Sequence, residues 1–128
     1  MIVFDHTKHK ELWNMIINLL FDPEENISTP AELKVKAFRI LHPHDDIPEG
    51  VCYACQYDVD IVDMFTKENQ SDYCDNCPLI WPDDRECDDI GSLYHDFMGA
   101  CYREDRETAI QVAETIRDLP IKEEVIAI

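Results

Sequence analysis

Two Cys-x2-Cys pairs constrain the fold of this chain more than any other feature of its sequence. Cys52 and Cys55 form the first pair, Cys74 and Cys77 form the second, and eighteen residues separate the two pairs. A Cys-x2-Cys turn places two thiolates on one side of a tight loop, so two such turns complete a tetrahedral set of four sulfur ligands. The spacing therefore predicts a structural zinc ion held by these four cysteines. A closed set of four thiolates leaves no position for a catalytic water.

Other roles for the cysteines remain open. Paired thiols also form disulfides or carry redox chemistry, although no strand–helix unit flanks either pair in the order that a thioredoxin-like site requires. Unliganded cysteines pack as small apolar side chains, and this is the role that we expect for Cys87 and Cys101. Cys87 also follows the second pair closely enough to substitute for one of the four zinc ligands.

The cysteine content and the first residues together predict an intracellular protein. Asp5, His6, Lys8 and His9 lie where the apolar core of a signal peptide would begin. The longest apolar run, residues 15–21, is interrupted by Asn18 and is too short to span a membrane. Six cysteines without a secretory signal fit a reducing compartment, where thiols serve more often as metal ligands than as disulfides. We therefore expect a cytoplasmic location and no membrane association.

Negative charge is concentrated in the middle of the chain. The formal net charge is −17, and residues 45–89 contain fourteen acidic residues against only Lys67 and Arg85. A field of this sign repels nucleic-acid phosphates and attracts basic protein surfaces, so direct DNA or RNA binding is disfavoured. Either the acidity only keeps the protein in solution, or it forms a surface that binds a partner. The carboxylates predicted to form that surface belong to Asp45, Asp46, Asp58, Asp60, Asp63, Asp83, Asp84, Glu86, Asp88 and Asp89.

Apolar periodicity predicts four helices. They span about residues 7–20, 30–41, 92–102 and 105–118. The second has the clearest start, because Thr29, Pro30 and Glu32 match the N-cap, the N1 proline and the N3 glutamate of a capping box. Gly99 and the charged residues 103–107 leave open whether the last two helices are separate or form one kinked helix.

The predicted fold class is α+β, and mainly α. Residues 57–61 alternate between apolar and acidic side chains, which predicts a short strand within a hairpin. We expect this hairpin to belong to a zinc-knuckle lobe, of the zinc-ribbon or treble-clef-like type, over about residues 51–89. The helices would surround this lobe within a single domain that spans residues 1–128.

Five short motifs follow one another along the chain. They are HKELW at residues 9–13, CYACQY at 52–57, CDNCPLIW at 74–81, GSLY at 91–94 and IRDLP at 116–120. In this order the chain resembles a group of small proteins encoded by tailed phages and prophages of Gram-positive bacteria. The resemblance covers most of the chain, although residues 30–50 and 58–73 are particular to this sequence. It implies a phage-encoded cytoplasmic accessory protein with a cysteine-bound metal, and it assigns no catalytic residue.

These features favour a protein that acts by binding rather than by catalysis. The sequence has no nucleophile motif, no Gly-rich phosphate loop and no acid–base pair of carboxylates. We expect a small acidic zinc-binding protein that binds and modulates, by inhibition, a bacterial host or defence protein with a basic surface. In the sharpest form of this hypothesis its carboxylates imitate the phosphates of a nucleic acid. Two alternatives are a zinc-finger regulator associated with nucleic acid and an accessory metal-dependent hydrolase or nuclease.

Overall fold

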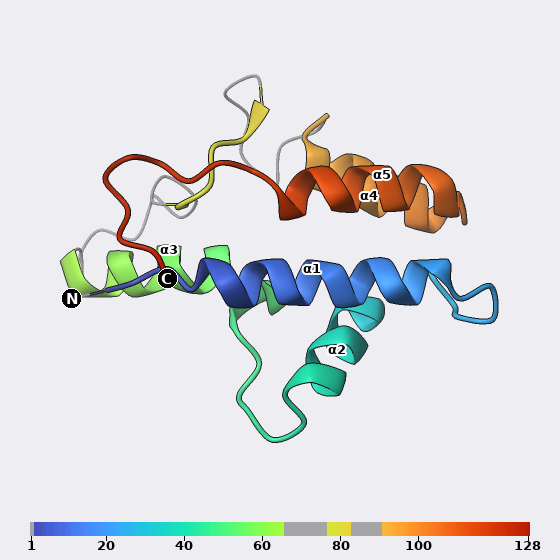
Figure 1. Cartoon of the computed structure of the whole chain (residues 1–128), viewed down its shortest axis with the longest axis horizontal. Coiled ribbons are helices and arrows are strands. Elements are labelled where there is room, and N and C mark those ends of the chain that lie inside the picture. Colours follow the sequence, from blue (N-terminus) through green and yellow to red (C-terminus); the bar gives the residue numbers. More distant parts are fainter. Residues whose placement is uncertain (1, 66–76, 83–90) are drawn as a thin grey trace.

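The computed structural model describes residues 2–65, 77–82 and 91–128, and that part of the chain is mainly helical (Figure 1). The elements in chain order are α1 (His6–Phe21), α2 (Pro30–Leu41), the 3-10 turn η1 (Glu49–Val51), α3 (Tyr53–Phe65), α4 (Leu93–Tyr102) and α5 (Arg106–Arg117). The mainly helical class is confirmed, and α1, α2, α4 and α5 match the four predicted helices within one or two residues at each end. None of the helices in these ranges is long and apolar enough to cross a membrane.

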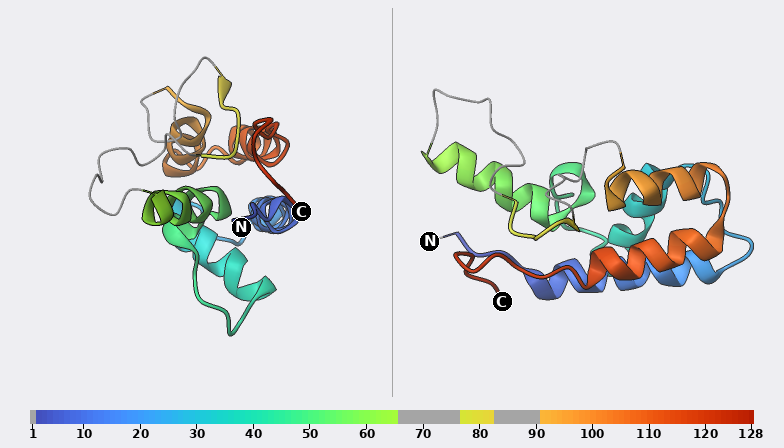
Figure 2. Two further views of the ribbon diagram at one scale, coloured as in Figure 1. Left: turned by 90° about the vertical axis from the view of Figure 1, so that its left-hand side faces the viewer. Right: turned by 90° about the horizontal axis from the view of Figure 1, so that it is seen from above.

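Helix α1 contacts α5, α2 and α3. Helix α5 packs along one side of it and α2 along another, and α4 packs against α5 (Figures 1 and 2). Leu12, Trp13, Ile16 and Leu20 form one apolar stripe on α1, and none of them is more than 2% exposed. The indole of Trp13 meets the ring of Phe97 on α4 edge to face, with ring centroids 5.2 Å apart. Packing of this stripe therefore joins the first helix to the last two.

Local capping fixes where three of the helices begin. Asp5, Ser92 and Asp105 each accept a hydrogen bond from the backbone N–H three residues later, at 2.9–3.2 Å. Helix α2 starts where the sequence predicts, but the Thr29 side chain makes no cap bond to the backbone. Its hydroxyl instead donates to the carboxylate of Glu32 at 3.2 Å, so the two capping-box residues contact one another directly.

The last two helices are separate. Helix α4 ends at Tyr102 with Arg103 as its C-cap, and Glu104 takes a positive φ of 57°, the left-handed conformation that commonly ends a helix. The turn is closed by the N–H of Glu104 donating to Cys101 and by the N–H of Asp105 donating to Ala100, both at 2.9 Å. Asp105 then caps α5, so three consecutive residues stop one helix and start the next.

The strand and hairpin predicted around residues 57–61 are wrong, because this segment is the middle of α3. Five alternating residues are too few to separate a strand from a helix. Ala54, Asp58 and Ile61 share one helical face, and Ala54 and Asp58 are only 1% and 3% exposed. The described part of residues 51–82 contains no zinc-knuckle lobe. Residues 66–76 and 83–89 of the predicted lobe lie outside the described residues.

The segment that carries Cys77 runs beside the chain that follows α5. Leu79 and Ile121 form an antiparallel bridge, and the N–H of Ile80 donates to Pro120 at 2.8 Å. A second bond, from the N–H of Lys122 to Pro78 at 2.9 Å, completes this pairing. The pairing holds residues 77–82 against the bundle, close to the start of α3.

Candidate functional site

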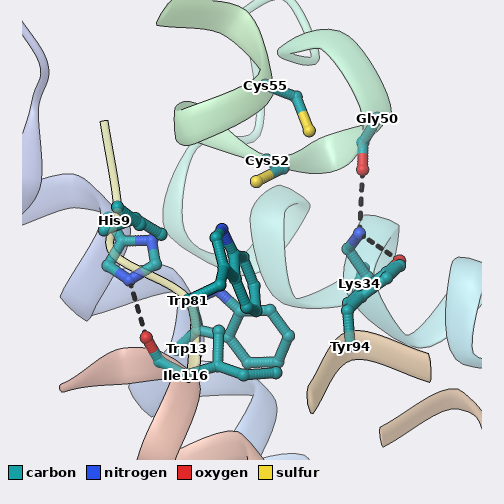
Figure 3. A pocket seen from close by; sticks show the side chains of 10 residues that line it. His9, Trp13, Lys34, Gly50, Cys52, Cys55, Trp81, Tyr94 and Ile116 are labelled. Atoms are coloured by element: carbon teal, nitrogen blue, oxygen red, sulfur yellow. Dashed lines mark hydrogen bonds between the residues drawn. The ribbon is translucent and has the colours of Figure 1, made fainter. Parts of the chain in front are cut away.

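A pocket of about 150 Å³ lies where the helices meet the cysteine-bearing segments (Figure 3). Most of its wall is aromatic or aliphatic, but two buried basic side chains and the first cysteine pair also line it. The lining residues are His9, Trp13, Lys34, Gly50, Cys52, Cys55, Leu79, Trp81, Tyr94 and Ile116. Predicted metal ligands and buried polar groups therefore share one region of the molecule.

The first cysteine pair lies at the start of α3. Gly50 and Val51 both have positive φ angles, of 63° and 50°, so the chain turns sharply just before Cys52. The carbonyl of Cys52 then accepts the first hydrogen bond of α3, from the N–H of Gln56 at 3.0 Å. A hydrogen bond with Cys55, together with burial, raises the pKa of the Cys52 thiol well above its ordinary value. The two sulfur atoms are therefore neighbours, as one half of a four-thiolate site requires.

Cys77 lies in the same region. It is 8% exposed, and the indole Nε1–H of Trp81 donates to its sulfur at 3.4 Å. Burial raises the pKa of the Cys77 thiol, and the nearby Cys52 raises it further. N–H groups directed at sulfur are the usual outer partners of zinc-bound thiolates, so Trp81 fits that role.

The other predicted ligands cannot be placed beside these three. Cys74 and the substitute ligand Cys87 lie outside the described residues. Among the side chains that the structure describes, no three of His, Cys, Asp or Glu come close enough together to hold a metal ion. The described residues therefore supply the adjacent pair Cys52 and Cys55 with Cys77 nearby, and not a complete ligand set.

Cys101 has the buried role that the sequence predicts. Its side chain is fully buried on α4, and burial raises the pKa of its thiol to about 11. No disulfide joins any of the four cysteines in the described ranges. Cys101 therefore acts as a small core side chain, and it offers a cysteine control that lies outside the candidate metal site.

Lys34 is a buried charged side chain of the site, and none of the sequence motifs includes it. Only 3% of it is exposed, and its ammonium donates to the carbonyl of Gly50 at 2.8 Å and to the hydroxyl of Tyr94 at 2.7 Å. Its nitrogen also lies 4.6 Å from the centroid of the Tyr94 ring. In the part of the chain that the structure describes, no carboxylate pairs with it. Its charge opposes the effects that raise the pKa of the Cys52 thiol.

His9 is the second buried basic side chain at the pocket. It is 1% exposed, and burial is the main cause that lowers its pKa to about 4, so the imidazole is neutral at pH 7. Its Nε2 lies 3.2 Å from the carbonyl oxygen of Ile116, whereas its Nδ1 is buried without a partner within the described residues. A carbonyl only accepts hydrogen bonds, so Nε2 carries the proton and Nδ1 presents a lone pair.

Both Lys34 and His9 lie on the apolar stripe of their helix, and this position was the sequence signal that could have identified them. Lys34 lies one residue after Leu33 and three before Ala37, on the buried side of α2. His9 lies three and four residues before Leu12 and Trp13 on α1, both of which are buried. A basic residue at a core position needs a partner or a neutral state, and this requirement marks it as a site residue.

The predicted partner-binding carboxylates are divided by their burial. Asp45, Asp46 and Asp60 are exposed, and Asp60 accepts a hydrogen bond from the amide of Gln56 at 2.9 Å. Asp58 is only 3% exposed, so its assignment to an accessible binding surface is corrected. Asp63 belongs to α3. The other five predicted residues, Asp83, Asp84, Glu86, Asp88 and Asp89, lie outside the described residues.

Comparison with known proteins adds no relative to these observations. No family model, no curated protein and no solved structure matches this chain. The site must therefore be interpreted from its own residues.

Proposed function

We propose that this chain is a small zinc-stabilised acidic protein that binds and inhibits a bacterial host or defence protein. The observation that carries the proposal is the uncompensated acidity of the middle of the chain, where residues 45–66 contain no lysine or arginine. The proposed setting is the cytoplasm of a phage-infected bacterium, which rests on the resemblance of the cysteine motifs.

The proposed zinc ion would stabilise the fold and take no part in catalysis. Cys52, Cys55 and Cys77 would hold it together with Cys74, and bound zinc would join α3 to the segment at residues 77–82. Four thiolates around a divalent ion carry a net charge near −2. The buried ammonium of Lys34 and the indole N–H of Trp81 would offset this charge, and both support the choice of these cysteines as ligands.

The proposed binding surface begins at the exposed carboxylates. The side chain of Asp45 is 63% exposed, and Asp46 and Asp60 are also exposed. Such charges accelerate and orient the approach of a basic partner, and their effect falls as salt is added. If the carboxylates imitate nucleic-acid phosphates, the partner would be a protein whose own nucleic-acid site is basic.

An affinity capture from bacterial lysate tests this function. The tagged wild-type chain is compared with the triple variant Asp45→Asn, Asp46→Asn and Asp60→Asn, which keeps the size of each side chain and removes its charge. We expect one stoichiometric bacterial protein with the wild-type chain, retained after nuclease treatment and strongly reduced with the variant. Equal recovery with both chains, or recovery only through nucleic acid, would contradict the proposal.

A further inference from the structure

A groove in the surface lies where the end of α1 meets the start of α5, and its volume is about 420 Å³. The two helices lie side by side and run in opposite directions (Figures 1 and 2). Arg106 at the start of α5 donates to the carbonyl of Leu20 near the end of α1, at 3.1 Å. The groove is therefore framed by two packed helices and not by a loop.

The floor of this groove is apolar. Leu20 is fully buried, Ile110 is partly buried, and Phe21, the last residue of α1, is 67% exposed. Three other phenylalanines of the described chain are no more than 1% exposed. Removing apolar surface from water is favourable by about 25 cal/mol per Å², so a partner that covers the ring of Phe21 would gain affinity.

The charges that the groove presents outward are negative. Glu107 and Glu114 line it from α5, and both are exposed. Within the described residues neither carboxylate forms an ion pair. Arg106 also lines the groove, but its guanidinium donates to three backbone carbonyls of residues 20–25. A docked partner would therefore meet an apolar floor and two unpaired carboxylates.

The spacing of the two carboxylates suits a helical partner. Glu107 and Glu114 are seven residues apart, which is about two turns or 10 Å of α-helix. Ile110 and Gln111 lie between them on the same face. A second helix laid along this face would present lysine or arginine at the same seven-residue spacing, with a large apolar side chain between them.

The charge of the chain argues against other occupants. A second copy carries the same net charge of −17, so it would be repelled from an acidic groove. Nucleic acids and anionic membrane surfaces present phosphates, and carboxylates repel these too. A basic partner is the class that the exposed charges attract.

We propose that this groove binds a basic amphipathic helix of another protein. Its apolar side chain would pack between Phe21 and Ile110, and its cations would pair with Glu107 and Glu114. The proposal goes beyond the proposed function, because it adds an apolar contact that needs no zinc ion. None of the carboxylates at positions 45, 46 and 60 lines the groove, so the two surfaces can be tested separately.

Two labelled peptides of the same composition test the proposal. The first is a helix of about fifteen residues with leucine along one face and lysine beside it, and the second has the same residues in an order that removes the apolar face. Fluorescence anisotropy at physiological salt measures their binding to the full chain. We expect the amphipathic peptide to bind at least about tenfold more tightly. Equal affinity of the two peptides would overturn the proposal, since charge alone would then explain binding.

Variants place the amphipathic peptide in the groove. Phe21→Ser should weaken its binding by about tenfold, because an aromatic anchor is lost. Tyr102→Ser changes a side chain that is 60% exposed outside the groove, so it should leave the affinity unchanged. Unchanged affinity of Phe21→Ser would overturn the proposal.

Charge variants separate this groove from the acidic surface proposed above. The double variant Glu107→Gln and Glu114→Gln should weaken binding of the amphipathic peptide by about fivefold and reduce its salt dependence. The triple variant at Asp45, Asp46 and Asp60 should bind this peptide as the wild type does. A loss of affinity in the triple variant alone would place the peptide on the acidic surface and overturn the groove, while leaving the proposed function intact.

Discussion

The helical bundle and the cysteine-bearing side of the molecule are stabilised in different ways. The bundle, formed by α1, α2, α4 and α5, buries a continuous apolar core, and three of its helices begin at capping side chains. The cysteine side, residues 49–58 with 77–82, buries the thiol of Cys77 and the carboxylate-bearing Asp58. Lys34 of the bundle donates across the boundary to Gly50. The apolar core therefore accounts for the bundle, whereas the cysteine side is where the proposed zinc ion would add stability.

The largest effect should come from removing one proposed ligand. Cys52→Ser or Cys77→Ser should abolish zinc binding and unfold the cysteine side, because the free energy of metal binding is folding free energy for such a site. Zinc content by elemental analysis and hydrogen exchange of each segment measure the two effects. Cys101→Ala, which alters a buried cysteine of α4, should keep its zinc. A Cys77→Ser protein that lacks metal yet protects residues 49–58 as the wild type does would show that the cysteine side needs no zinc.

The two tryptophans allow the bundle and the cysteine side to be compared without replacing a proposed zinc ligand. Trp13 is 2% exposed and contacts Phe97 within the bundle, so Trp13→Ala should lower the free energy of unfolding by about 3–5 kcal/mol. Trp81 is only partly buried on the cysteine side, so Trp81→Ala should cost less but should speed the release of zinc to a chelator. Urea titrations and chelator kinetics measure these quantities. Equal losses of unfolding free energy for the two variants would show that the bundle and the cysteine side do not differ in how they are stabilised.

Lowering the pH should weaken the bundle itself through His9 of α1, whose imidazole donates to the carbonyl of Ile116 on α5. Burial is the main cause that lowers its pKa to about 4 from an ordinary value of 6.5, so folding favours the neutral imidazole. This contribution to stability is complete above pH 6.5 and is lost as the pH falls towards 4, by up to about 3 kcal/mol. Urea unfolding at several pH values measures it as the difference between the wild type and His9→Phe. A constant difference from pH 7 to pH 4.5 would show that His9 titrates alike in the folded and unfolded chains.

The same division explains what could be predicted from the sequence. Helices α1, α2, α4 and α5 were predicted because an apolar stripe and flanking capping or breaking residues agree locally. Helix α3 was missed because alternation at residues 57–61 suggested a strand, while the face shared by Ala54 and Asp58 indicated a helix. An aspartate on that buried face obscured the helical period. The outcome follows from tertiary packing, which outweighs a pattern of five residues.

The candidate site was only partly predictable for a related reason. Spacing alone identified the cysteines, because a Cys-x2-Cys turn acts within one stretch of chain. The contact of Lys34 with Gly50 and Tyr94 spans 16 and 60 residues of sequence, and no local pattern encodes such a contact. The Nδ1 of His9 became significant only when the position of Ile116 showed which ring nitrogen already has a partner.

Replacing Lys34 should have the smallest effect on stability. It should nevertheless distinguish the two regions best, because it should change zinc binding and the stability of the metal-free chain differently. Lys34→Met removes the charge and keeps an apolar stem, so stability of the metal-free chain should stay equal or rise, since a buried ammonium is costly. Zinc affinity should fall by about tenfold, because a nearby positive charge favours the thiolate form that binds metal. Competition with a chromogenic chelator measures the affinity, and urea unfolding of the metal-free chain measures the stability.

The matched control for Lys34 is its neighbour on the exposed side of the same helix. Lys36 pairs with Glu25 at 2.7 Å, with its side chain 52% exposed, so Lys36→Met should leave zinc affinity unchanged and alter stability only slightly. Opposite signs for metal affinity and metal-free stability in Lys34→Met would identify the ammonium as a counter-charge to the thiolates. A loss of both zinc affinity and metal-free stability would mean that Lys34 acts only through its hydrogen bonds to Gly50 and Tyr94. These ordinary polar contacts would then hold the cysteine side to the bundle.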